Sequence, residues 1–210
     1  MQNDHEDLLP TRWTLIGRLK NWGDEKSWRE FFDTYWKLIY GVARRAGLTP
    51  EDAQDVVQET IVSVCKAMEA FKADPQRGSF KSWLLTVTRS RIIDLQRKRL
   101  RQPAVAGPSP QASTQSTPLE ERAPDPAGNG FDALWNGEWE RNLITLALER
   151  LEKKTSARHY QVFLLHVIKQ HPAEQVARIS GVAVNQVYLI KHRLAPQFRE
   201  AICDLENKMA

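Results

Sequence analysis

The hydrophobic pattern of residues 28–46 repeats every three or four positions, which is typical of one face of an α-helix. Apolar or small residues hold this face at Trp28, Phe32, Tyr35, Ile39, Val42 and Ala46. Gly47 is expected to end the helix. The next four residues, Thr49-Pro50-Glu51-Asp52, offer an N-cap, a proline at the first helical position and two acids for the first turn. A second helix is therefore predicted to begin at Pro50.

The second helix keeps the same spacing, and a third follows after a short loop. The apolar face of the second helix is expected at Ala53, Val57, Thr60, Val64, Ala67 and Phe71. Residues 74–78 contain Pro and Gly and predict the loop, and Ser79 caps a helix that runs to about Leu100. A shorter helix is predicted around Trp13–Asn21. The alternation typical of a strand is absent from the sequence, so an all-α fold is predicted.

Residues 102–130 have the composition of a linker. Six prolines lie in this segment, and Val105 and Leu119 are its large apolar residues. Such a segment buries too little surface to offset the entropy of ordering it. We therefore expect two small helical domains, 1–101 and 131–210, joined by a flexible, disordered linker, 102–130.

The second domain is predicted to contain four helices. They span Phe131–Glu152, Thr155–Lys169, Pro172–Ile179 and a longer stretch from Asn185. Pro196 lies inside the last one, where it is expected to kink or break the helix.

The spacing of Ala177, Gly181 and Val187 predicts a helix-turn-helix. A small residue lets the two helices cross closely, glycine takes the turn, and a branched residue anchors the second helix. That second helix would offer polar and basic side chains to a major groove. An ordinary helical hairpin is the alternative.

Composition limits the class of protein. The chain has 210 residues and a mass of 24.1 kDa, enough for one medium domain or two small ones. No apolar run reaches the ~18 residues of a membrane helix, and the acidic start is not a secretory signal. Cys65 and Cys203 are too few for a disulfide framework or a zinc site. A reduced, cytoplasmic protein is expected.

Charge is unevenly distributed. Residues 1–101 hold 18 Lys or Arg against 14 Asp or Glu, residues 102–141 hold 2 against 6, and residues 142–210 hold 10 against 6. Within 81–101 there are seven basic residues and one acid, Asp94. This concentration indicates a polyanionic partner, with a solvated helix face as the alternative.

The helix predicted from Pro50 carries a mostly acidic stripe opposite its apolar face. Its members are Asp52, Asp55, Glu59 and Lys66, with Gln58 beside them. A solvated face is one interpretation. A divalent-metal cluster is disfavoured, because no partner acids or histidines lie nearby in the sequence.

Aromatic and basic residues interleave between residues 80 and 98. This arrangement is typical of proteins that stack unpaired bases while following a phosphate backbone. Phe80 and Trp83 are equally compatible with a place in the core, and for Trp83 the core is favoured. No such alternative applies to Arg89, Arg97 and Lys98.

These signals coincide in one known family. Residues 31–101 resemble the second conserved region of bacterial RNA polymerase sigma factors of the extracytoplasmic-function group. The motifs are Asp52-Ala53-Gln54-Asp55-Val56-Val57-Gln58-Glu59, Gly78-Ser79-Phe80-Lys81-Ser82-Trp83-Leu84 and Arg91-Ile92-Ile93-Asp94-Leu95-Gln96-Arg97-Lys98. Residues 143–199 resemble the fourth region, which ends in its helix-turn-helix.

The resemblance implies three sets of site residues. The face that binds the clamp of the polymerase's largest subunit would comprise Asp52, Asp55, Gln58 and Glu59. The part that melts and holds the minus-ten element would comprise Arg77, Phe80, Lys81, Trp83, Arg89, Arg91, Arg97 and Lys98. The reader of the minus-thirty-five element would comprise Asn185, Gln186, Tyr188, Leu189, Lys191, His192 and Arg193.

The resemblance also implies the partners and the class of function. It implies a non-enzymatic initiation factor without cofactor or metal, whose partners are core RNA polymerase, promoter DNA and an anti-sigma factor. A free-standing helix-turn-helix regulator is the alternative, but it leaves the acidic stripe unexplained. A DNA-processing enzyme such as a recombinase would need a nucleophile with activating partners or clustered carboxylates, and the sequence shows no such set.

Overall fold

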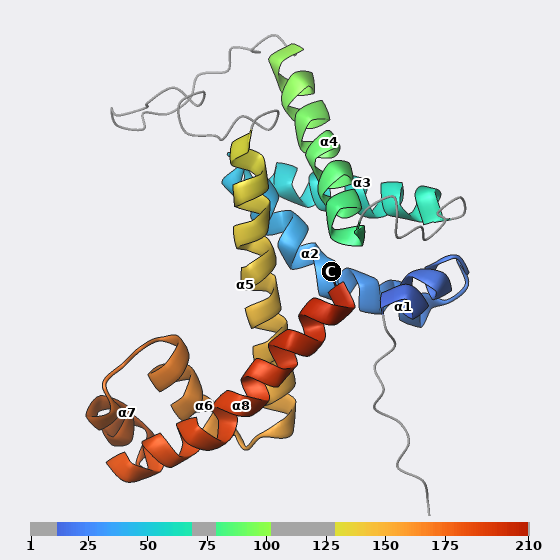
Figure 1. Cartoon of the computed structure of the whole chain (residues 1–210). Helices are drawn as coiled ribbons and strands as arrows, with labels where there is room; N and C mark the ends of the chain where they lie inside the picture. Colours follow the sequence, from blue (N-terminus) through green and yellow to red (C-terminus); the bar gives the residue numbers. More distant parts are fainter. Residues whose placement is uncertain (1–11, 69–78, 102–128, 210) are drawn as a thin grey trace, which may run out of the picture. The chain divides into compact units, whose positions relative to one another are not determined.

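The computed structural model describes residues 12–68, 79–101 and 129–209, and these residues form an all-α protein (Figure 1). The first part contains α1 (Arg12–Leu19), α2 (Glu25–Arg45) and α3 (Pro50–Met68), and α4 (Phe80–Arg101) follows. The last part contains α5 (Asn129–Lys154), α6 (Ala157–Phe163), a π-helical turn (Leu164–Ile168), α7 (Ala173–Ser180) and α8 (Val184–Met209). The predicted fold class and the order of its helices are confirmed.

The chain divides into two compact units, Met1–Glu140 and Arg141–Met209. The division falls inside α5, whereas the sequence pattern placed the start of the second domain at residue 131. Most of the expected linker, 102–128, lies outside the described residues, and its last two positions already belong to α5.

The helix ends of the N-terminal unit follow from local chemistry. Asp24 caps α2 by accepting hydrogen bonds from the Ser27 backbone N–H (3.1 Å) and the Ser27 hydroxyl (2.6 Å). The bond from the hydroxyl, followed by the one from the backbone, lowers the pKa of Asp24. Gly47 has a φ of 86°, a left-handed conformation in which glycine is unstrained, and it ends α2 as predicted.

The core of the N-terminal unit lies between α2, α3 and α4, which pack in sequence order. The expected face of α2 is buried from Tyr35 to Ala46, but Phe32 is exposed and Phe31 takes its place in the core. The α3 face is buried from Ala53 to Val64, and Phe71 lies outside the described residues.

The C-terminal unit contains the predicted helix-turn-helix. Ala177 and Val187 are buried in one apolar cluster with Val176, Ile190 and Leu194, and Val162 and Phe163 of α6 complete it. Gly181 takes the turn with a φ of 63° and donates its N–H to the Ala177 carbonyl. The helix-turn-helix geometry that the spacing predicted is therefore present.

Pro196 does not break α8. The helix runs without interruption from Val184 to Met209, with Pro196 exposed inside it. The predicted break is therefore wrong. The preceding helical turns are anchored by buried Val187, Ile190 and Leu194, and this packing outweighs the loss of one backbone hydrogen bond.

The turn before α7 holds a residue in a strained conformation. Gln170 has a φ of 58°, and the side chain of an L-residue is disfavoured there by roughly 1 kcal/mol or more. We expect Gln170→Gly to raise the free energy of unfolding by about 0.5–1 kcal/mol in urea titrations. Gly181→Ala, at an equally left-handed φ, should lower it by about 1 kcal/mol. Equal effects of the two substitutions would contradict this account.

Candidate nucleic-acid and protein interfaces

The acidic stripe on α3 is exposed over three of its four predicted binding residues. Asp55, Gln58 and Glu59 all have exposed side chains, and Lys66 continues the stripe. Their positions lie opposite the buried Ala53, Val57 and Val64. Because they contribute nothing to the core, this face can contact a partner without any change in the fold.

Asp52 differs from the rest of the stripe. Its side chain is only 13% exposed and forms an ion pair with Arg99 of α4. The same carboxylate accepts a hydrogen bond from the Thr49 hydroxyl (2.9 Å), whose oxygen in turn accepts from the Asp52 backbone N–H (3.3 Å). Thr49 therefore caps α3, while Asp52 orients this cap and joins α3 to α4, a structural role that its sequence spacing did not reveal.

The basic residues of α4 fall into two groups. Arg97 and Lys98, near the end of the helix, have exposed side chains. Arg91 is partly buried and lies 3.5 Å from the Asp94 carboxylate on the next turn. The end of α4 is therefore the part of this helix where the basic side chains are most accessible.

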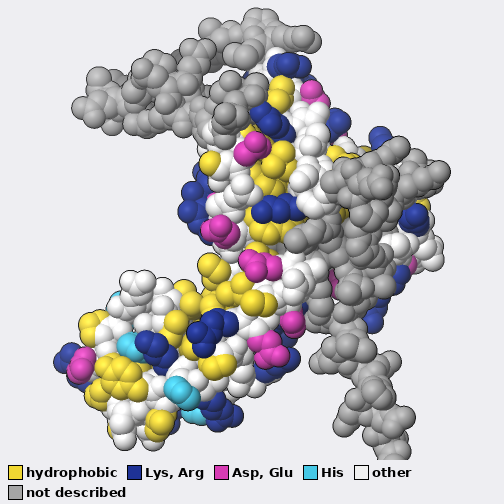
Figure 2. All heavy atoms as spheres, viewed as in Figure 1, with side chains coloured by type: hydrophobic (Ala, Val, Ile, Leu, Met, Phe, Trp, Pro, Cys, Tyr) yellow, Lys and Arg dark blue, Asp and Glu magenta, His cyan; other side chains and the backbone are white. Residues whose placement is uncertain are grey.

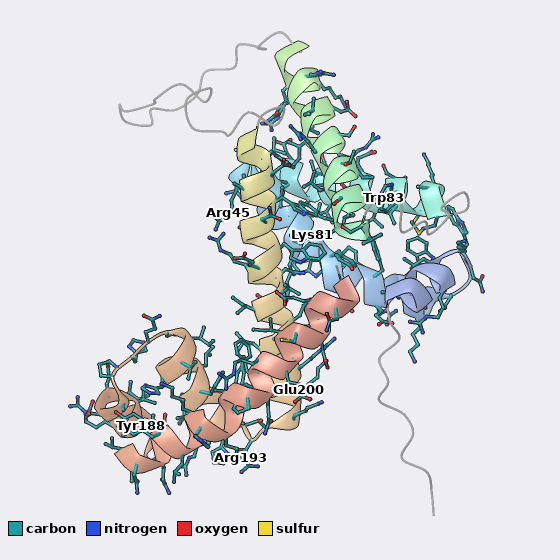
Figure 3. The ribbon with its side chains drawn as sticks, viewed as in Figure 1. Arg45, Lys81, Trp83, Tyr188, Arg193 and Glu200 are labelled. Carbon is teal, nitrogen blue, oxygen red and sulfur yellow. The ribbon has the colours of Figure 1, made fainter. Side chains whose placement is uncertain are left out.

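Phe80 belongs to the core. It is 1% exposed, and its ring centroid lies 6.1 Å from Phe31, 5.5 Å from Tyr35 and 5.4 Å from Trp83. A ring enclosed by other rings cannot stack on a base in this conformation, so the assignment of Phe80 to minus-ten contact is corrected to a core role. Trp83 is half-buried at the edge of this cluster (Figure 3).

Lys81 and Arg89 contact aromatic rings from the first half of α5. The Lys81 ammonium lies 5.0 Å from the centroid of Trp139, and the Arg89 guanidinium lies 5.4 Å from that of Phe131. Arg89 also lies 3.9 Å from the Asp132 carboxylate. In this conformation, both cations are therefore partly covered by residues 131–139.

Glu138 fixes this part of α5 against α2. Its side chain is buried, pairs with Arg45 and lies directly over Gly41, where an added Cβ would collide with the carboxylate. These contacts of Glu138 were not predicted from the sequence. The sequence feature that could have predicted this packing is an aromatic residue at every fourth position. These residues are Phe131, Trp135 and Trp139, and all three are buried.

The first turns of α8 expose every residue predicted to read DNA. These are Asn185, Gln186, Tyr188, Leu189, Lys191, His192 and Arg193. The Gln186 side-chain oxygen accepts the Ala183 N–H (3.2 Å), so this residue also caps α8. The ring of Tyr188 meets His166 edge to face at 5.7 Å, which restricts its orientation.

Arg193 lines a hollow in the C-terminal unit. The hollow has a volume of about 310 Å³, and its other lining residues include Lys154, Ser156 and His159. Two permanent cations beside hydroxyl and imidazole groups make a surface suited to a phosphate group. Figure 3 shows Arg193 farther along α8 than Tyr188.

Arg77 lies outside the described residues. Among residues 12–68, 79–101 and 129–209, no group of three or more His, Cys, Asp or Glu is placed to hold a metal ion, and no helix is long and apolar enough to cross a membrane.

Burial raises the pKa of the Cys65 thiol, so this thiol is a weak nucleophile.

Comparison with known proteins identifies the class of the N-terminal unit. Residues 31–102 match the family model Sigma-70 region 2, so this part of the chain is similar to region 2 of that family. The chain is also 30% identical over 89 residues to the ECF RNA polymerase sigma factor RpoE of Cereibacter sphaeroides, a match that covers 42% of this chain and 48% of the relative. These matches support the resemblance of the chain to sigma factors of the extracytoplasmic-function group.

Two other similarities were found. The ECF RNA polymerase sigma factor SigE of Mycolicibacterium smegmatis is 31% identical over 73 residues, which are 35% of this chain and 27% of the relative. A solved structure, that of CnrH in complex with the cytosolic domain of CnrY, aligns with 93% of this chain and 97% of its own, at a TM-score of 0.35 and 19% identity. The chain thus matches about half of one curated relative and about a quarter of the other.

Proposed function

We propose that this protein is a non-enzymatic sigma factor that binds core RNA polymerase and directs it to promoters. One observation carries the proposal: a segment similar to region 2 of the sigma-70 family is joined in one chain to a helix-turn-helix with an exposed second helix. Such a factor needs neither a catalytic group nor a cofactor. It works where the polymerase is, in the cytoplasm.

Each of the three surfaces would bind a different target. Asp55, Gln58 and Glu59 bind the clamp of the largest subunit, with Asp52 holding α3 in position. The exposed basic end of α4, together with Lys81, Trp83, Arg89 and Arg91, follows the melted minus-ten strand. Use of Lys81 and Arg89 on DNA requires the first half of α5 to leave them. The first turns of α8 read the minus-thirty-five element.

The proposal is tested by reconstitution. The full-length protein should co-elute with core polymerase and start transcription at a defined promoter that core alone does not use. A free-standing regulator, the alternative, would bind duplex DNA without associating with core. An anti-sigma factor is a further proposed partner, since both binding faces are exposed and a separate protein could cover them.

Arg193 and Gln186 should affect DNA binding differently. Arg193 lies in the basic hollow, where it meets a phosphate, so Arg193→Ala should weaken binding by a similar factor on all sequences and lower the salt dependence. The hydrogen bond to Ala183 uses the side-chain oxygen of Gln186, so its amide N–H groups can donate to a base edge. Gln186→Ala should therefore change the base preference at one promoter position. Binding by the holoenzyme to a panel of single-base promoter variants measures both. Equal loss of sequence preference would contradict this division.

A further inference from the structure

The outward face of α8 exposes two large apolar side chains, those of Tyr188 and Leu189. Val187, Ile190 and Leu194 are buried, and at about 100° per residue the opposite face comprises Asn185, Tyr188, Leu189 and His192. Leu189 is 66% exposed and Tyr188 is 52% exposed. Neither apolar surface packs within the helix-turn-helix core.

Two more exposed apolar residues lie on either side of the turn between α7 and α8. Ile179 ends the exposed side of α7, and Val184 begins α8 one turn before Tyr188. Figure 2 shows hydrophobic side chains among basic and histidine side chains on the visible surface of this unit. The chain thus leaves apolar surface exposed in the part of α8 that would enter a groove.

The charge around these residues favours a nucleic acid over a protein surface of mixed charge. From residue 175 to residue 199 the sequence contains no Asp or Glu, while Arg178, Lys191, Arg193 and Arg199 are all present and exposed. An apolar surface within a segment that carries cations and no acid is complementary to a groove bordered by phosphates.

The chemistry of the groove then selects the base. A leucine side chain has no donor or acceptor, so it cannot read the hydrogen-bonding pattern of a base edge. The feature of the major groove that an apolar group does recognise is the C5-methyl group of thymine. Tyr188, whose orientation is restricted by its edge-to-face contact with His166, presents its ring next to Leu189 in the sequence.

We propose that Leu189 is a specificity-determining residue that recognises a thymine methyl group in the minus-thirty-five element, with Tyr188 enclosing the contact. The inference rests on the proposed function and adds the base feature that is read. Preference for thymine at this position then arises from apolar contact, and neighbouring positions depend on Asn185 and Gln186.

The test replaces thymine by deoxyuridine, which lacks only the methyl group. A preferred minus-thirty-five duplex is first selected from a randomised pool with the holoenzyme, and each thymine is then replaced singly. At one or two positions, deoxyuridine should weaken binding about fourfold, the value of one buried methyl group. Leu189→Ala should bind thymine and deoxyuridine duplexes equally at those positions.

Two controls separate this contact from general weakening. Lys191→Ala should reduce affinity for both duplexes by the same factor and keep their ratio. Circular dichroism of Leu189→Ala should match that of the unaltered protein, since this side chain is exposed.

The inference is overturned if no thymine is sensitive to loss of its methyl group, or if the sensitivity persists in Leu189→Ala. It is also overturned if Leu189→Ala leaves promoter binding unchanged and instead abolishes binding of a protein partner. Both the selection of the duplex and the thymine-to-deoxyuridine comparison are repeated with the full chain alone, without core polymerase. A failure to bind core polymerase would then refute the proposed function, while the methyl test would still be read on DNA.

Discussion

The Asp55→Lys, Glu59→Lys double variant is expected to bind core RNA polymerase about 100-fold more weakly than the unaltered protein. Both side chains are exposed on α3, opposite its buried face, so the variant should fold normally. Placing like charges against a basic partner costs several kcal/mol, and each 1.4 kcal/mol is a factor of about ten in affinity. Titration of labelled protein with core polymerase measures the loss.

A matched control keeps the change in net charge but moves it elsewhere. Asp33→Lys, Glu206→Lys reverses two exposed carboxylates on α2 and α8 and should bind core within a few-fold of the unaltered protein. If both double variants lose the same affinity, net charge and not this face determines binding.

The Asp52→Asn variant distinguishes a role of Asp52 in stability from a role in binding core polymerase. The substitution removes the charge that pairs with Arg99, so its main effect should be a lower melting temperature by a few degrees, with core affinity reduced far less than in the α3 double variant. A loss of core binding equal to that of the double variant, at an unchanged melting temperature, would return Asp52 to the binding face.

The sequence predicted the helices well where their ends depend on local chemistry. Gly47, Thr49 and Gly181 mark boundaries because a left-handed turn or a side-chain cap is determined by a few neighbouring residues. The exchange of Phe31 for Phe32 in the core was not predictable in this way. Adjacent aromatic residues both fit a helical period, and packing against Phe80 and Tyr35 decides between them.

The candidate surfaces were predicted as sets, while the role of each member depends on tertiary contacts. Asp52 and Asp55 lie on the same side of the predicted helix, and the contacts of Asp52 with Thr49 and with Arg99 of α4 distinguish them. Likewise, Lys81 and Arg89 look like free cations until α5 places Trp139 and Phe131 against them. Contacts between residues so far apart in the sequence leave no local pattern to read.

Phe80→Ala is expected to destabilise the N-terminal unit by about 3–5 kcal/mol, which is enough to unfold many domains of this size. The ring is fully buried between Phe31, Tyr35 and Trp83, so truncation leaves a cavity that rigid neighbouring rings cannot fill. Urea titration followed by tryptophan fluorescence measures the loss. The Arg97→Ala, Lys98→Ala variant alters only exposed side chains and should stay within about 0.5 kcal/mol of the unaltered protein.

Among variants that fold, DNA binding should depend on the Arg97 and Lys98 side chains and not on the Phe80 ring. Phe80→Leu retains most of the buried volume and should keep both the fold and the affinity of the holoenzyme for minus-ten single strands. The Arg97→Ala, Lys98→Ala variant should bind these strands more weakly and with a shallower salt dependence, because two phosphate contacts are lost. If folded Phe80→Leu loses as much single-strand affinity as the arginine and lysine pair, the ring must leave the core to meet a base, and its core assignment fails.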